Sequence, residues 1–356
     1  MLDRLRERLT NLTTLTTTKA TVGATPADVV HTENKWRLLH YRARPQGLAR
    51  RTPVLLVPSL INRHYVLDLM PGKSFTEYLV AQGHDVFAID WGTPGPEDRF
   101  LTFDDICDRY LGRAVRIAAR NAPDGRVHLF GYCLGGVLTT IYAAARPEHV
   151  ASLTAVAAPV RFKDDGMLAS WVADPGFDLG ALVDACGNIP SSLMQSAFQM
   201  LRPTLGLAKV VGLVDRLWDT EFVAGYAALE TWATDNVSMP GEFFRRYIDE
   251  LYRGDALIEG KFTLSGDLVL LRNITCPTLA VTFLHDNIVP WKSAAVLIDE
   301  VGSTDKHHLH LPGTHVGSVI SRGAAKSLWP QLSTWLAQRD AEPLRRRPVL
   351  KARRSG

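Results

Sequence analysis

The sequence has few cysteines, little net charge and no long apolar run, and each of these deficits excludes a class of protein. The 356 residues include four cysteines, whose spacing fits neither a disulfide framework nor a zinc site. The formal net charge of +3 is too small to indicate a nucleic-acid partner. No stretch of about 18 residues is uninterruptedly apolar, so we expect no transmembrane segment, and the charged N terminus lacks the apolar core of a secretory signal. We therefore expect a cytoplasmic protein with reduced thiols.

Short apolar runs bounded by proline or glycine are the main regular feature of the sequence. These runs are predicted to be buried strands, at residues 54–57, 86–89, 127–130, 153–157, 279–283 and 308–311. Longer amphipathic stretches between them are predicted helices, at residues 74–82, 103–121, 136–146 and 324–338. This alternation predicts an α/β fold with a mostly parallel sheet and helices on both faces.

One connection is too long for a simple crossover between strands. Residues 162–275 include helix-like stretches at 193–200 and 221–234, and we expect them to form an inserted helical cap over the carboxyl edge of the sheet. An extended part of the main core is the alternative. With a cap, the chain divides into an N-terminal tail (1–28), a core in two parts (29–161 and 276–338), the cap (162–275) and a basic C-terminal tail (339–356).

The N-terminal region carries two conflicting signals. Leucines at spacings of three and four suit one face of a helix, namely Leu2, Leu5, Leu9, Leu12 and Leu15. The threonine-rich stretch 13–18 has poor helix propensity. We expect a loosely ordered tail, with a docking helix as the alternative.

The sequence GYCLGG, residues 131–136, lies between a predicted strand and a predicted helix. Many hydrolases carry G-x-S-x-G at such a junction, and here Cys133 stands in the place of the serine. A strand that turns sharply into a helix strains its middle residue, and small neighbours let the turn close. Cys133 is therefore the predicted nucleophile, and a buried structural cysteine is the alternative.

In this arrangement an acid and then a histidine follow the nucleophile along the chain. Asp286 leaves the predicted strand 279–283 into a loop, and His315 lies in the loop after the predicted strand 308–311. Cys133, Asp286 and His315 are therefore the predicted catalytic triad.

Two backbone N–H groups are predicted to form an oxyanion hole. One belongs to Leu134, directly after the nucleophile, and the other to Ile61 in the loop after strand 54–57, with Asn62 close behind. We also expect Asn62 and Tyr65 to contact the substrate. The alternative is that this loop only packs beneath the cap.

Four stretches together resemble the catalytic subunit of polyhydroxyalkanoate synthases, which have an α/β-hydrolase fold. They are VPSLINRHYVLDLMPGKSFTEYLVAQGHDVFAIDWG, GYCLGG, MPGEFFRRYIDELY and THVGSVIS, and the resemblance runs from about residue 38 to 339. The short N-terminal region is similar to that of the two-subunit classes. Such synthases use Cys, Asp and His at the positions of Cys133, Asp286 and His315. The family's histidine directly after the aspartate is replaced here by Asn287.

The resemblance implies an acyltransferase that polymerises (R)-3-hydroxyacyl-CoA into a polyester through a cysteine acyl-enzyme, without a metal or other cofactor. It also implies a second synthase subunit, a homodimer and a place at the surface of polyester granules. Two alternatives keep the fold. One is a polyester depolymerase or acyl-CoA thioesterase that uses water as the acceptor, and the other is a non-catalytic granule-associated binding protein.

Overall fold

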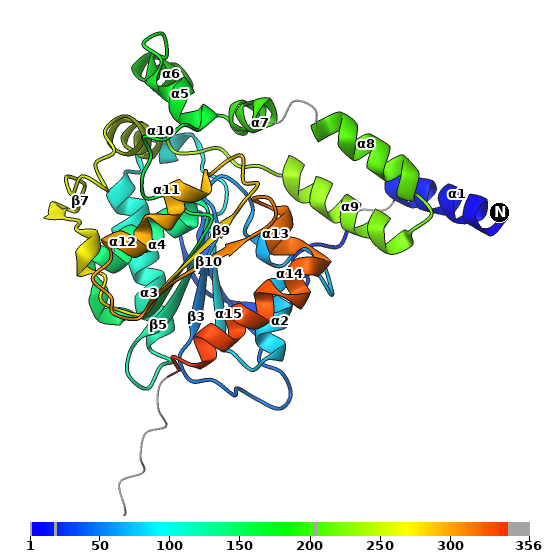
Figure 1. The fold of residues 1–356 in the computed structure, drawn as a ribbon, viewed down its shortest axis with the longest axis horizontal. Helices are drawn as coiled ribbons and strands as arrows, with labels where there is room; N and C mark the ends of the chain where they lie inside the picture. Colours follow the sequence, from blue (N-terminus) through cyan, green and yellow to red (C-terminus); the bar gives the residue numbers. More distant parts are fainter. Residues whose placement is uncertain (1, 18–19, 202–204, 341–356) are drawn as a thin grey trace, which may run out of the picture.

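The computed structural model describes residues 2–17, 20–201 and 205–340 and contains a large mixed sheet (Figure 1). Its strands are β1 (Ala27–Glu33), β2 (Trp36–Tyr41), β3 (Val54–Val57), β4 (Val86–Asp90), β5 (Val127–Tyr132), β6 (Val150–Val156), β9 (Thr278–Phe283) and β10 (Lys306–Leu311). Their order is β1-β2-β4-β3-β5-β6-β9-β10. All pairs are parallel except β1–β2 and β2–β4. The six strands predicted from apolar runs are confirmed, while β1 and β2 were not predicted.

The helices of the core lie before and after residues 162–275. They are α2 (Phe75–Ala81), α3 (Gly112–Ala119), α4 (Leu134–Ala145), α11 (Trp291–Ala295), α12 (Leu297–Glu300), α13 (Gly317–Ile320), α14 (Arg322–Lys326) and α15 (Leu328–Ala337). Shorter turns of helix are η1 (His64–Leu67), η2 (Pro96–Phe100), η4 (Pro147–His149) and η6 (Leu271–Asn273). The predicted helix 103–121 is a π-helix, η3 (Asp105–Leu111), that continues into α3.

Two hydrophobic cores cover the two faces of the sheet. In β3, Leu55 and Val57 face a core with α3 and α4, whereas Val54 and Leu56 face a core with α2 and α15. Because successive side chains of a strand point to opposite faces, a strand covered on both faces must be apolar throughout. This explains why the central strands read as unbroken apolar runs.

Residues 162–275 contain a succession of helices beyond the carboxyl ends of the central strands (Figure 1). They are α5 (Met167–Ala173), α6 (Leu179–Cys186), α7 (Ser191–Met200), α8 (Leu205–Arg216), α9 (Thr220–Thr234), α10 (Gly241–Arg246) and the π-helix η5 (Tyr247–Arg253), followed by a small hairpin of β7 (Thr263–Leu264) and β8 (Asp267–Leu268). The proposed domain boundaries and the covering role of this segment stay predictions.

The N terminus forms helix α1 (Leu2–Thr17) rather than the loosely ordered tail that we expected. Tertiary packing outweighs the poor propensity of the threonines, because α1 packs against α9. The amide of Asn11 donates to the carbonyl of Leu217 at 2.8 Å. The prediction of a loose tail is therefore wrong for residues 2–17.

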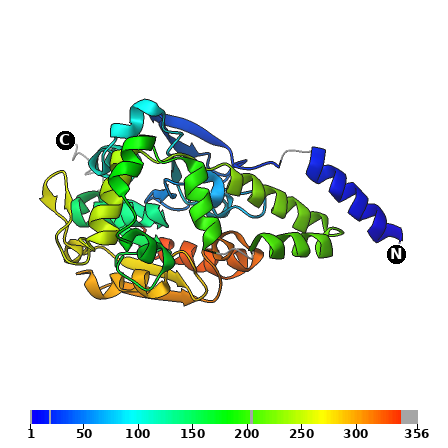
Figure 2. The ribbon, with the colours of Figure 1, turned by 90° about the horizontal axis from the view of Figure 1, so that it is seen from above.

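Helices α1, α8 and α9 project sideways from the body of the molecule, and we refer to them as the arm (Figures 1 and 2). The arm exposes large apolar side chains, namely Leu9, Leu12, Val210, Val211 and Val214. Among the helices of the described residues, none is long and apolar enough to cross a membrane. The predicted basic tail lies outside the described residues from position 341 onward.

Candidate active site

Cys133 occupies the sharp turn between β5 and α4. Its φ of 56° and ψ of −126° lie in a region that residues other than glycine rarely adopt, as expected of a strained turn. Its backbone N–H donates to the Val156 carbonyl at 2.9 Å, which fixes the turn to the neighbouring strand. A side chain at Gly135 would collide with the Val57 carbonyl, and one at Gly131 would collide with Thr139. The glycines are therefore needed for the close approach of α4 to the sheet.

His315 and Asp286 meet at the same edge of the sheet as Cys133. His315 is 6% exposed, and its Nδ1 lies 2.7 Å from Oδ2 of Asp286. The other oxygen of Asp286 accepts hydrogen bonds from the N–H groups of Ile288 and Val289, both at 2.9 Å. The Cys133 thiol lies close enough to the histidine to affect its pKa. The structure thus brings the three predicted triad residues together.

The surroundings of His315 favour its protonated form. Burial by itself lowers the pKa of His315, but the charges of Asp286 and Cys133 and the hydrogen bonds to both outweigh it and raise this pKa to about 10. The Tyr132 hydroxyl donates to the His315 carbonyl at 3.2 Å and helps to hold the loop. The imidazole is therefore placed to accept the proton of the thiol.

The two predicted oxyanion donors differ in their present partners. Leu134 is the first residue of α4, so its N–H has no partner within the helix. The N–H of Ile61 donates to the Ser59 hydroxyl at 3.3 Å, and its carbonyl accepts from Val237 at 3.2 Å. Both stay predictions, and the Ile61 donor would have to exchange its long bond to Ser59 for one to an oxyanion.

Asn62 and Tyr65, the predicted substrate contacts, are engaged within the protein. The Asn62 amide donates to Asn236, and the Tyr65 hydroxyl donates to Asp235 at 2.7 Å. Both partners follow the end of α9. A direct contact of Asn62 or Tyr65 with substrate stays a prediction.

Comparison with known proteins places the chain in a family. An alpha/beta hydrolase fold model matches residues 52–315, and a model of the poly-beta-hydroxybutyrate polymerase (PhaC) N-terminus matches residues 2–79. The chain is 36% identical to the poly(3-hydroxyalkanoate) polymerase subunit PhaC of Allochromatium vinosum, over 89% of this chain and 90% of that protein. It is 33% identical to the same subunit of Synechocystis, over 95% of this chain and 91% of that protein. The chain belongs to the PhaC family of polymerase subunits.

Solved structures confirm the fold of this PhaC family member. A soluble variant of the monoglyceride lipase of Saccharomyces cerevisiae superposes with a TM-score of 0.55, 13% sequence identity and coverage of 90% of this chain and 97% of that chain. A hydrolase from Pseudomonas aeruginosa superposes with a TM-score of 0.51 and 15% identity, over 88% and 99% of the two chains. At such identities the likeness concerns the fold alone. The predicted α/β-hydrolase fold is thereby confirmed.

The other three cysteines differ from Cys133 in their surroundings. Burial raises the pKa of Cys107 well above its usual range and the pKa of Cys276 to about 11. Cys186 is exposed and lies at the end of α6. Within the described residues, no group of His, Cys, Asp and Glu side chains could hold a metal ion. Only Cys133 combines a histidine partner with the strained turn.

Two tyrosines that the triad motifs do not predict lie near Cys133 on the π-helix η5. The ring centroids of Tyr247 and Tyr252 are 5.4 Å apart, and Tyr252 also packs against Phe162 at 5.0 Å. Burial is the largest cause that raises the pKa of both hydroxyls, and the nearby charge of Cys133 raises it further. The signal that could have found them is their position in MPGEFFRRYIDELY, one of the stretches that carries the family resemblance.

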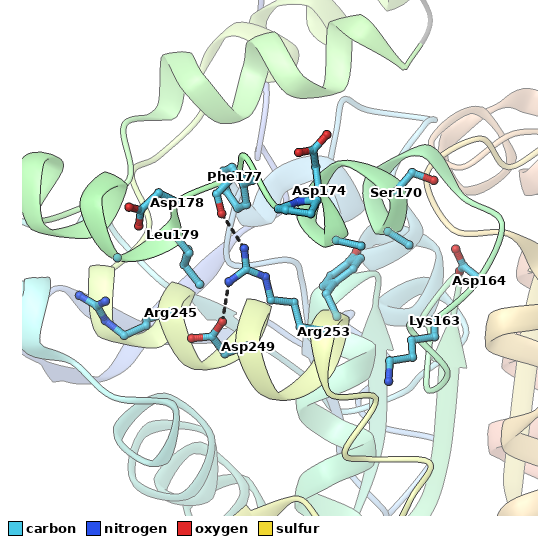
Figure 3. Close-up of a pocket in the computed structure, with 15 residues that line it drawn as sticks. Lys163, Asp164, Ser170, Asp174, Phe177, Asp178, Leu179, Arg245, Asp249 and Arg253 are labelled. Carbon is cyan, nitrogen blue, oxygen red and sulfur yellow. Dashed lines mark hydrogen bonds and ion pairs between the residues drawn. The ribbon is translucent and has the colours of Figure 1, made fainter.

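A cavity of about 900 Å³ opens between the segment of α5 and α6 and the helices α10 and η5 (Figure 3). On its wall, Arg253 donates to the Phe177 carbonyl at 2.7 Å and forms an ion pair with Asp249 at 3.1 Å. The triad residues do not line this cavity, whereas Tyr252 does. The cavity therefore reaches Tyr252 and not the triad residues.

Proposed function

We propose that this protein polymerises (R)-3-hydroxyacyl-CoA thioesters into a polyester and releases CoA. The observation that carries the proposal is the Cys133 thiol in a strained turn, close to a histidine that is itself hydrogen-bonded to a buried carboxylate. The membership in the PhaC family supports the substrate class, because the relatives are named poly(3-hydroxyalkanoate) polymerase subunits.

A thiol suits this reaction better than a hydroxyl. Attack of a thiolate on a thioester exchanges one thioester for another with little change in free energy. The acyl group then stays activated for transfer to the next hydroxyl, whereas a serine ester would be more stable and slower to react. The cysteine in place of the usual serine is thereby explained.

The geometry suggests a sequence of proton transfers. His315 takes the thiol proton of Cys133 through Nε2, because its Nδ1 is bonded to Asp286. The thiolate attacks the carbonyl carbon, the N–H groups of Leu134 and Ile61 hold the oxyanion, and His315 returns the proton to the departing CoA sulfur. In the next step His315 takes the proton of a 3-hydroxyl group, whose oxygen attacks the acyl-enzyme and releases Cys133.

Asp286 has the geometry of an orienting residue. One of its oxygens binds His315, and the other is occupied by two backbone N–H groups. With both oxygens engaged, the carboxylate holds the imidazole in one orientation and stabilises its positive charge. We therefore assign Asp286 to His315 rather than to the incoming hydroxyl group.

The same proposal includes a second synthase subunit, a homodimer and a location at the granule surface. The exposed apolar side chains of the arm support an association with another protein or with the polyester. A partner that binds there would raise activity by shifting the arrangement of residues 162–275, not by supplying catalytic groups. Limited proteolysis tests this point, because cleavage within 162–275 should change when a partner subunit is added. Full activity of the isolated chain, with no effect of a partner on rate or cleavage, would contradict it.

The deciding experiment uses the purified protein with 3-hydroxybutyryl-CoA, with and without candidate partner subunits. A polymerase releases CoA and forms polymer, whereas a depolymerase or thioesterase of the same fold releases free acid alone. A non-catalytic granule-binding protein releases neither. Free acid without polymer under all conditions would overturn the proposal in favour of a hydrolase.

A further inference from the structure

The end of helix α9 is tied to the loop that carries the predicted oxyanion donor Ile61. The Asp235 carboxylate accepts a hydrogen bond from the Tyr65 hydroxyl at 2.7 Å and pairs with the Arg63 guanidinium at 2.9 Å. The next residue, Asn236, accepts from the Asn62 amide. The backbone N–H of Val237 donates to the Ile61 carbonyl at 3.2 Å. Three consecutive residues after α9 therefore hold the loop 61–65.

The loop has further anchors on either side of these contacts. The Trp232 indole, in the last turn of α9, donates to the Arg63 carbonyl at 3.0 Å. On the opposite side, the His64 ring lies 3.3 Å from the Asp90 carboxylate at the end of β4. The position of the loop is thus set jointly by α9 and by the sheet.

A small movement of this loop would change the oxyanion hole. Residues 57 and 58, at the end of β3 just before the loop, approach the turn of Cys133 so closely that a side chain at Gly135 would strike both of their carbonyl groups. An oxyanion donor acts only at about 2.7–3.1 Å from the developing charge. The N–H of Ile61 must also leave the Ser59 hydroxyl to reach an oxyanion. The contact of Val237 with the Ile61 carbonyl, together with the contacts of residues 62–65, restricts the position of the Ile61 backbone and so limits where its N–H can lie.

We propose that Asp235 is a positioning residue for acyl transfer, which holds the loop 61–65 so that the Ile61 N–H can bind the oxyanion. This inference rests on the proposed function, because it needs a tetrahedral intermediate at Cys133. Asp235 acts through Arg63 and Tyr65, whose side chains it contacts.

The position of Asp235 also connects the arm to the reaction. Helix α9 is held to the body near its start by an ion pair between Glu221 and Arg322, in which Nε of Arg322 donates to a Glu221 oxygen at 2.7 Å, and α1 packs against α9. A displacement of α9 by a bound partner reaches the loop 61–65 through Asp235, Asn236 and Val237. A movement of the arm can therefore change the position of the Ile61 N–H through these three residues.

The test compares two reactions of the same thiol in the full-length protein. Acylation by 3-hydroxybutyryl-CoA forms an oxyanion, whereas alkylation by iodoacetamide is a direct displacement that forms none. Asp235→Ala should slow the release of CoA in a single turnover by about 10- to 100-fold, somewhat less than the loss of a whole oxyanion donor. Its rate of alkylation at Cys133 should stay at the parent value.

Two further variants make the comparison specific. Tyr65→Phe removes the hydrogen bond from the Tyr65 hydroxyl to Asp235 and should slow acylation by a smaller factor, again without an effect on alkylation. Glu230→Ala breaks the ion pair with Lys209 within the arm, leaves the loop contacts intact and should match the parent in both reactions. Thermal unfolding of each variant confirms that the fold is retained, and Tyr65→Phe serves if Asp235→Ala does not fold.

Each outcome has a defined meaning. Slower acylation with unchanged alkylation supports the positioning role. Equal loss in both reactions would show general damage to the thiol site and overturn it, as would acylation at the parent rate. A parent protein that alkylates but never releases CoA would instead refute the proposed function, and the inference with it.

Discussion

His315 and His128 are both buried histidines at opposite edges of the same sheet, and their pKa values move in opposite directions. His128 lies near the start of β5, where burial lowers its pKa to about 3 and its partner is the Ser152 hydroxyl at 2.8 Å. His315 lies just beyond the end of β10, where Asp286 and Cys133 overcome the effect of burial and raise its pKa to about 10. A charged partner, and not burial itself, separates a catalytic from a structural histidine here.

His84, just before the start of β4, follows the same pattern as His128. His84 is buried against Ser333, with its Nε2 2.9 Å from the hydroxyl, and burial lowers its pKa to about 4. Both histidines are neutral packing groups. The reactive side chains therefore lie at the carboxyl ends of the strands, where the loops carry charged and nucleophilic groups. Four experiments test this difference between the two edges of the sheet.

The largest effect is expected at the nucleophile. Cys133→Ala should abolish the release of CoA and leave the fold intact, because the role of this residue is chemical. Cys186→Ala and Cys276→Ala should keep activity, since neither has a histidine partner. Turnover of Cys133→Ala at the parent rate would remove the basis of the proposed mechanism.

Replacement of the two histidines by the same residue compares the two edges directly. His315→Gln should slow acylation by about 10²–10⁴-fold, the usual contribution of general acid–base catalysis. His128→Gln keeps a hydrogen-bonding group near Ser152 and should leave acylation unchanged. The two single-turnover rates check this, and similar losses in both variants would show that the edges do not differ as described.

Replacement of the acid tests the role assigned to Asp286. Asp286→Asn should slow acylation and chain growth by the same factor, because the carboxylate acts through His315 in both steps. The measurement separates CoA release in the first turnover from polymer formation afterwards. A much larger loss in chain growth than in acylation would instead indicate that Asp286 activates the incoming hydroxyl.

The smallest effect concerns stability and pH. The pKa values of His84 and His128 are lowered in the folded protein. Below about pH 6.5 the unfolded chain therefore binds protons that the native state does not, and the free energy of unfolding decreases as the pH is lowered. Between about pH 7 and pH 5 each histidine should remove about 2 kcal/mol from the free energy of unfolding. Over this pH range the free energy of unfolding of His128→Gln, measured with denaturant, should decrease by about 2 kcal/mol less than that of the parent. Parallel losses in variant and parent would contradict the pKa assignment.

The sequence contained enough local information to predict the central sheet and the triad. Strands such as Val54–Val57 are buried on both faces and read as apolar runs, and the order of Cys133, Asp286 and His315 follows from where the strands end. The outer strand β1 has an exposed face and no such run, so it was missed. The contacts of Asp235 with Arg63 and Tyr65 join segments about 170 residues apart, as their sequence separations of 172 and 170 show, and no local pattern marks them. Helix α1 was only the alternative prediction, because its leucine spacing is visible in the sequence but its packing on α9 is not.

In the proposed mechanism Cys133 carries the acyl group during catalysis. The most direct test is mass spectrometry of the intact protein and its peptides after brief mixing with 3-hydroxybutyryl-CoA and an acid quench. We predict an added 3-hydroxybutyryl group, or a short oligomer of it, on the peptide that contains Cys133, and none on the same peptide of Cys133→Ala. An acyl group on another residue, or CoA release with Cys133 unmodified at every time point, would contradict the account.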